Sequence, residues 1–166
     1  SLEAHSPVEG EPVLFLGEWC RLHNRKSAWE KLDTVVAPYH WDDRKKLHKD
    51  YLYLKGLYEE LLIELAAKLN TIHEVNHTIR YWRIIVGPWL GHFTQILFDR
   101  WAMLQQVVQD NNISSVCVLK HKQDQFVPND MNSFVTLFIN DAWNEYIYSQ
   151  ILDWIKFPVK KIDRRN

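Results

Sequence analysis

The chain is poor in cysteine, and Cys20 and Cys117 are its only two. Two cysteines in 166 residues do not make a disulfide framework, so the sequence fits a reducing compartment. A membrane span is also missing from the sequence, because no apolar run reaches the roughly 18 residues that one requires. We therefore expect a cytoplasmic protein. Peripheral association with the inner face of the membrane is compatible with this expectation.

An excess of charge of either sign is missing too. Twenty basic residues against 21 acidic ones give a formal net charge of −1. A nucleic-acid-binding domain normally has a basic excess on one face, so we expect no nucleic-acid partner. The polar N-terminus does not have the basic-then-apolar layout of a signal peptide. We interpret residues 1–11 as a disordered lead-in.

Aromatic residues, by contrast, are abundant: the chain has eight Trp, seven Tyr and seven Phe. With 46% hydrophobic residues the chain can bury one core, and we expect a single domain over residues 12–166. Large rings fill such cores. Rings also line pockets for flat or sugar-like ligands, because they combine apolar area with polar edges. Both interpretations apply to each ring at this stage.

The pattern of apolar residues predicts an alternation of strands and helices. Short apolar runs that end at breakers predict strands at 13–16, 34–37 and 113–119, and a strand start at 159–162. Apolar residues at steps of three and four predict long helices over 42–70, 88–108 and 130–155. Residues 78–86 fit a strand or a helix, and we favour a helix with a kink or restart at Gly87-Pro88.

This order of elements predicts a helix-rich, three-layer α/β domain. The last predicted strand begins close to the end of the sequence. We therefore expect the chain to be a fragment of a longer protein.

Residues 73–77 read HEVNH and match the H-E-x-x-H pattern of zinc peptidases. On a helix this pattern places two imidazoles on one face to bind zinc, and Glu74 would activate a bound water. The extended form of the motif is absent, and Arg80 and Arg83 would place two positive charges beside a dication. A zinc metallopeptidase is kept as an alternative function. The competing interpretation is a solvated His73-Glu74 turn before a capped helix.

Other familiar chemistry is missing from the sequence. It contains no G-x-G-x-x-G, P-loop or G-x-S-x-G motif, and no Asp-x-Asp to hold a metal-bound diphosphate. The loops after the first two strands are more informative, since ligands of open α/β sheets bind at the carboxyl ends of strands. These loops combine bases, rings and arginines: Glu18, Trp19 and Arg21, then His40, Trp41, Asp42 and Arg44. Alternatively, the second loop only starts a helix.

Five segments resemble a family of transferases encoded at bacterial surface-polysaccharide loci. They are LFLGEWC (14–20), PYHWDDR (38–44), KDYLYL (49–54), NHTIRYWRIIVGPWL (76–90) and FDRW (98–101). The similarity covers residues 12–156, and family members are several times longer than this chain. The resemblance implies the N-terminal half of a two-domain, Rossmann-like sugar transferase of the GT-B type.

On this resemblance we expect a metal-independent glycosyltransferase that takes a nucleotide sugar as co-substrate and a glycan as acceptor, with no cofactor. The candidates for the catalytic base are, in order, Asp42, His40, Glu18 and His77. The residues expected to contact substrate, including an acidic sugar or phosphate at the arginines, are Arg80, Arg83, Trp82, Trp41, Trp19, Arg44 and Gly87. A non-catalytic α/β module whose aromatic surface binds a partner chain is the remaining alternative.

Overall fold

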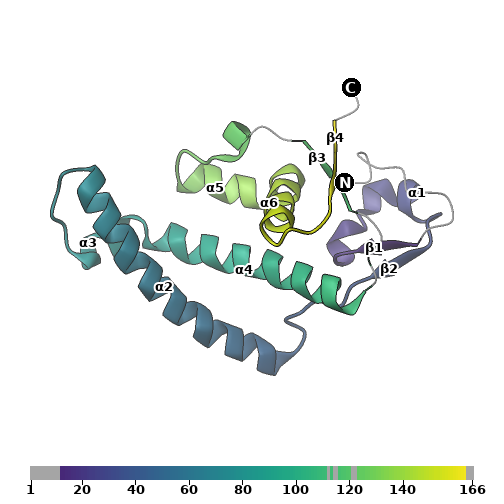
Figure 1. Ribbon diagram of the computed structural model, residues 1–166, viewed down its shortest axis with the longest axis horizontal. Helices are drawn as coiled ribbons and strands as arrows, with labels where there is room; N and C mark the ends of the chain where they lie inside the picture. Colours follow the sequence, from purple (N-terminus) through teal and green to yellow (C-terminus); the bar gives the residue numbers. More distant parts are fainter. Residues whose placement is uncertain (1–11, 112, 114–115, 121–122, 164–166) are drawn as a thin grey trace. The chain divides into compact units, whose positions relative to one another are not determined.

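The computed structural model describes residues 12–111, 113, 116–120 and 123–163 (Figure 1). The lead-in predicted for residues 1–11 lies outside this range. The chain divides into two compact units. One comprises the described residues of Ser1–His40 and Arg100–Asn166, and the other is Trp41–Asp99. The single domain predicted over residues 12–166 stays a prediction.

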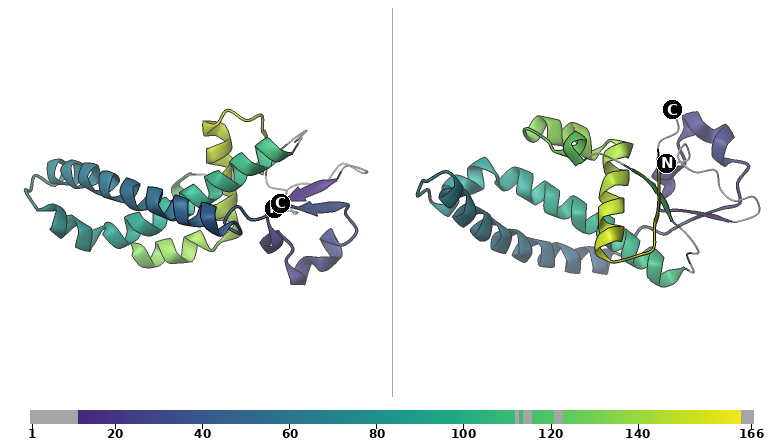
Figure 2. Two further views of the ribbon diagram at one scale, coloured as in Figure 1. Left: turned by 90° about the horizontal axis from the view of Figure 1, so that it is seen from below. Right: turned by 45° about the horizontal axis from the view of Figure 1, so that its top comes forward.

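The first unit contains two small parallel sheets. Strand β1 (Val13–Phe15) pairs with β2 (Thr34–Val36), and the two lie side by side in Figure 2. Between them run two 3₁₀ turns, η1 (Glu18–Cys20) and η2 (His23–Arg25), and the short helix α1 (Lys26–Trp29). Strand β3 (Cys117–Leu119) pairs with β4 (Lys160–Ile162). The predicted strands are therefore confirmed, and β3 covers the C-terminal end of the predicted 113–119 segment, of which residues 114–115 lie outside the described range.

The connection between β3 and β4 corrects one prediction. It contains the 3₁₀ turn η3 (Gln123–Phe126) and two helices, α5 (Met131–Phe138) and α6 (Asp141–Trp154), where the sequence predicted one helix over 130–155. The second helix starts at Asn140, whose side chain accepts hydrogen bonds from the backbone N–H groups of Ala142 and Trp143. Asparagine favours such caps over helix interiors, so the chain restarts there.

Capping also fixes the start of α5. The Asp130 carboxylate accepts from the backbone N–H of Ser133 at 2.7 Å, and the Ser133 hydroxyl accepts from the backbone N–H of Asp130 at 3.0 Å. Hydrogen bonds from Ser133 to the carboxylate, from its backbone N–H first and its side chain second, hold the pKa of Asp130 below its ordinary value. The reciprocal pair satisfies two donors that the helix cannot satisfy itself.

The core of the first unit joins both sequence stretches of that unit. Ala37 of the N-terminal stretch packs with Met103 and Val107 of the later one. A second cluster is built on Leu104, Val118 and Leu152. The carbonyl of Pro38 also accepts a hydrogen bond from the Gln106 side chain at 2.8 Å. Residues as far apart in the sequence as Pro38 and Gln106, which are 68 positions apart, therefore come together in the first unit.

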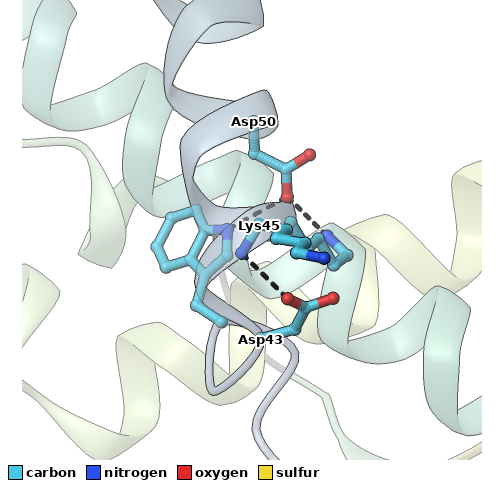
Figure 3. Close-up of polar contacts among 5 residues, drawn as sticks. Asp43, Lys45 and Asp50 are labelled. Carbon is cyan, nitrogen blue, oxygen red and sulfur yellow. Dashed lines mark hydrogen bonds and ion pairs between the residues drawn. The ribbon is translucent and has the colours of Figure 1, made fainter.

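The second unit is helical. Helix α2 (Arg44–Ile72) is followed by α3 (Ile79–Ile85) and by the beginning of α4 (Gly87–Asp110), which runs back in the direction opposite to α2 (Figure 1). The Asp43 carboxylate caps α2 by accepting from the backbone N–H of Lys45 at 2.8 Å (Figure 3). The predicted helix start near Asp42 or Asp43 and the favoured helix over 78–86 are both confirmed.

The break before Pro88 is a bend of a nearly continuous helix. The Val86 N–H still donates to the Trp82 carbonyl at 2.8 Å, and the Leu90 N–H to the Val86 carbonyl at 2.9 Å. Proline has no N–H to donate, which explains why regular bonding lapses for about one residue.

The described residues form a helix-rich, mixed α/β structure, which confirms the coarse prediction, and their sheets are small and parallel. The three-layer, Rossmann-like and GT-B features stay predictions. Within the ranges given above, no helix has both the length and the apolar character that a membrane crossing needs.

Candidate functional site

The second unit carries an open groove of about 580 Å³. Volumes of this order are typical of small-molecule sites. The wall combines aromatic rings, two cationic side chains, an imidazole and small residues. It is formed by Trp41, Leu47, Tyr51, Leu54, Lys55, Tyr58, Arg83, Gly87, Pro88, Gly91, His92, Thr94 and Gln95. Helix α2 supplies one side, and α3 with the start of α4 supplies the other.

Two glycines leave room for Tyr58 at the start of α4. A Cβ added at Gly87 would lie 2.7 Å from the Tyr58 hydroxyl oxygen, which is closer than real Cβ contacts. At Gly91 the nearest atom would be a Tyr58 ring carbon at 3.7 Å, an ordinary contact. In the structure Gly87 thus leaves room for the Tyr58 side chain, and its predicted contact with substrate stays a prediction.

Arg83 lies at the edge of the groove and is held by Glu59. Its Nη1 and Nη2 atoms donate to Glu59 Oε1 and Oε2 at 2.7 and 2.6 Å, the bidentate geometry of an arginine–carboxylate pair. The guanidinium also lies over the Tyr58 ring, 5.8 Å from its centroid. The hydrogen bond between them lowers the pKa of the Glu59 carboxyl and raises that of Arg83.

The other residues predicted on α3 lie outside this groove. Arg80 is exposed on the helix surface. Trp82 is only 6% exposed, and its Nε1–H donates to Asn70 Oδ1 at 2.8 Å. This buried and hydrogen-bonded ring packs α3 against α2, and the expectation that Trp82 contacts substrate stays a prediction. His77 is exposed and stacks on Tyr81 with ring centroids 3.9 Å apart.

The zinc alternative loses its geometric basis. His73 caps the C-terminal end of α2, and Glu74 has a positive φ of 52°. Residues 73–77 therefore form a turn, so their imidazoles are not presented by one helical face as zinc peptidases require. Among the described residues, no three His, Cys, Asp or Glu side chains gather as a metal site. The competing interpretation, a solvated turn before a helix capped by Thr78, is confirmed.

The residues before α2 form a network of their own. The Trp41 Nε1–H donates to Asp50 Oδ2 at 3.0 Å, and Lys46 Nζ pairs with the same oxygen (Figure 3 labels Asp50). The Trp41 ring stacks on Phe98, with centroids 6.3 Å apart. Trp41 thus stands in the groove wall with its polar edge fixed. The adjacent Asp42 and the first residue of α2, Arg44, are exposed.

The remaining predicted residues lie in the first unit, at the ends of β1 and β2. Glu18 pairs with Arg21 at 3.5 Å. The ring of Trp19 meets that of Tyr39 edge-on, with centroids 5.8 Å apart, so the two strand-end loops contact each other. His40 is 3% exposed. A residue this buried needs a structural change before it can take a proton from an acceptor.

The groove brings Trp41, Arg83 and Gly87 together from the predicted set and adds residues that the sequence analysis missed. The most important additions are Lys55, Tyr58 and His92. Tyr51 and Tyr58 were assigned to the apolar stripe of α2, which is where they lie. Tyr51 and Tyr58 are seven residues apart with Lys55 between them, which places all three on one helical face. This spacing could have predicted that the three side chains line one side of a site.

No curated protein and no solved structure matches the chain significantly. A family model described as "LIC12162 family transferase" matches residues 1–166. The resemblance to a transferase family is therefore confirmed at this level, with substrate and pathway unspecified. The chain belongs to the LIC12162 family of transferases.

Proposed function

We propose that the chain is the N-terminal part of a metal-independent glycosyltransferase that uses a nucleotide-sugar donor in bacterial surface-polysaccharide synthesis. The observation that carries the proposal is the groove. In it, a chain of a transferase family presents aromatic rings together with hydrogen-bonding side chains. On this proposal the fold is the Rossmann-like first half of a GT-B arrangement. The donor binds mainly to the other half.

The groove suits the glycan acceptor. Aromatic rings such as Trp41 and Tyr51 offer flat apolar faces to the C–H side of a sugar, and the polar edge of Trp41 is already held by Asp50. Gln95 and Lys55 supply hydrogen bonds to hydroxyl groups. This mixture of rings and a few polar groups is typical of sites that fix the orientation of a small polar ligand.

The reaction needs a base for the acceptor hydroxyl and positive charge for the departing nucleoside diphosphate. As the hydroxyl oxygen bonds to the anomeric carbon, the base takes its proton and the donor's bond to the diphosphate breaks. Asp42 stays the first candidate for the base, because it is exposed and follows Trp41 of the groove wall. His40, Glu18 and His77 follow in that order. Protein cations then offset the leaving-group charge without a metal.

We place this enzyme in the cytoplasm, where nucleotide sugars are available, with peripheral association at the inner membrane face compatible with its task. The partners on this proposal are a nucleotide sugar and a glycan acceptor.

The test uses a longer family protein that contains this segment. Uridine, guanosine and cytidine sugar nucleotides are supplied in turn, and release of the nucleotide product is measured. We expect one of them to bind and turn over, and Asp42→Asn to lower turnover by about 10²-fold or more, as loss of a general base does. Asp124→Asn, which removes an exposed carboxylate from η3, is the matched control. Binding of none of the sugar nucleotides would contradict the proposal and favour a non-catalytic module.

A further inference from the structure

We infer that the groove of the second unit binds a sugar that carries an anionic group, carboxylate or phosphate, and that Glu59 occupies the anion position when the sugar is absent. The inference rests on the proposed function, because it names the chemical class of the acceptor. It concerns the groove wall at Lys55, Arg83 and His92.

The first observation is the charge of the wall. Its residues include two cations, Lys55 and Arg83, and the imidazole of His92. No aspartate or glutamate stands among the described residues that line it. A chain with nearly equal numbers of acidic and basic residues has no general reason for such an imbalance. Cations without carboxylates on a concave wall favour an anionic ligand, because their fields add within the groove.

The second observation is the state of Arg83. Both of its terminal nitrogens bind the two oxygens of one carboxylate, at 2.7 and 2.6 Å. This planar fork is the arrangement in which arginine recognises carboxylates and phosphates. Glu59 itself is not part of the groove wall, and its side chain is 48% exposed. It can therefore swing into solvent without leaving a buried charge when another anion takes its place.

The third observation is the surface under the guanidinium. Arg83 lies over the Tyr58 ring, and Gly87 lets the Tyr58 hydroxyl approach the start of α4. The stem of Arg83 also passes beside Gly87, since a Cβ added there would lie 3.4 Å from Arg83 Cγ. Ring and glycine thus hold the guanidinium at the groove edge with or without Glu59. The anion position is prepared before the ligand arrives.

The sugar body would lie along the remaining wall, with Trp41 and Tyr51 as ring faces and Gln95 as a hydrogen-bonding group. A neutral sugar could use these contacts but would leave the Arg83–Glu59 pair closed. An anionic sugar gains the Arg83 fork and must displace Glu59. The structure therefore predicts discrimination by charge, with Glu59 setting how strongly the anion must compete.

Ligand-observed NMR titration of this chain with glucuronate, glucose 6-phosphate and glucose tests the inference. We expect an anionic sugar to bind more tightly than glucose. Glu59→Gln should tighten that binding by about tenfold if the pair is closed about nine-tenths of the time, since apparent affinity scales with the open fraction. Arg83→Gln should abolish the preference for the anionic sugars, with circular dichroism confirming an intact helical fold.

Glu60→Gln is the matched control, because it removes the same charge from the next, exposed residue of α2. Glucuronate binding tighter than glucose 6-phosphate assigns a carboxylate to the site, and the reverse order assigns a phosphate. Three results would overturn the inference. The first is an equal effect of Glu59→Gln and Glu60→Gln, and the second is binding of glucose as tight as that of the anionic sugars. The third is that neither the wild type nor Glu59→Gln binds an anionic sugar. Failure of the longer protein to turn over sugar nucleotides would instead count against the transferase reaction, and would leave this binding result unchanged.

Discussion

The corner between α2 and α3 depends on one carboxamide, and Asn70→Ala tests this directly. Asn70 Oδ1 accepts from the Trp82 Nε1–H at 2.8 Å and from the His77 backbone N–H at 3.0 Å. Its Nδ2–H donates to the His77 carbonyl at 2.9 Å. Three hydrogen bonds from one side chain thus tie the end of one helix to the start of the next.

The expected cost follows from what water can replace. His77 is exposed, so its backbone groups regain water, and each of these bonds contributes about 0.5–1.5 kcal/mol net. Trp82 is 6% exposed, and its orphaned N–H would cost about 1–3 kcal/mol. We therefore expect Asn70→Ala to lower the free energy of unfolding by about 2–6 kcal/mol, the sum of these contributions. Asn70→Asp keeps both acceptor roles and should cost less.

The measurement is urea unfolding followed by far-ultraviolet circular dichroism in a double-mutant cycle. Trp82→Phe removes the buried donor, so Asn70→Ala should cost about 1–2 kcal/mol less in that background, within the range of coupled neighbours. Additive effects within about 0.5 kcal/mol would refute the claim that Asn70 acts through the Trp82 N–H.

Three further predictions concern helix propensity, pH and thiol chemistry. Gly56→Ala should stabilise α2 by about 0.5–1 kcal/mol, because open space surrounds that position. Gly87→Ala should stabilise the protein less, since the new Cβ would lie 2.7 Å from the Tyr58 hydroxyl oxygen. Thermal melts of both variants check the difference. The pKa of Glu59 is lowered by its bond to Arg83, so the stability it contributes is complete above the ordinary glutamate pKa of about 4.3 and is lost as pH falls through the lower folded value. The stability difference between wild type and Glu59→Gln should therefore be constant from about pH 7 to 5 and vanish in stronger acid, and a constant difference down to pH 2 would contradict the pairing. Burial raises the pKa of the Cys20 thiol, so iodoacetamide should alkylate it more slowly at pH 8 than it alkylates glutathione, as peptide mass spectrometry can follow; equal rates would contradict its burial.

The sequence was most informative where one residue type has one structural meaning. The acidic pair before an apolar period predicted the start of α2 at Asp42 or Asp43, and Asp43 caps it. The helix favoured over 78–86 begins after Thr78. The split between α5 and α6 was missed because the apolar residues on either side of Asn140 keep a helical spacing. The helical spacing of the apolar residues favoured one continuous helix, although Asn140 is the N-cap of α6.

The candidate site was predicted less completely, for a physical reason. Sequence patterns report which side of one helix is apolar, but a groove depends on the distance between two helices. Lys55 and His92 line the same groove only because the chain reverses between α2 and α4. Trp82 shows a second limit of sequence patterns, since a tryptophan beside two arginines suits a sugar site as well as it suits the core that it occupies. Its predicted contact with substrate stays a prediction.

The division of the chain has a consequence for how the protein is made. The second unit, Trp41–Asp99, is contiguous, whereas the first unit joins stretches that are separated by it. During synthesis the helices of the second unit can assemble once Asp99 has left the ribosome. The first unit must wait for Met103 and Val107 to reach Ala37, and for β4 to pair with β3. We expect β1 and β2 to be exposed longest on the nascent chain, and this makes them the segments most in need of protection by chaperones.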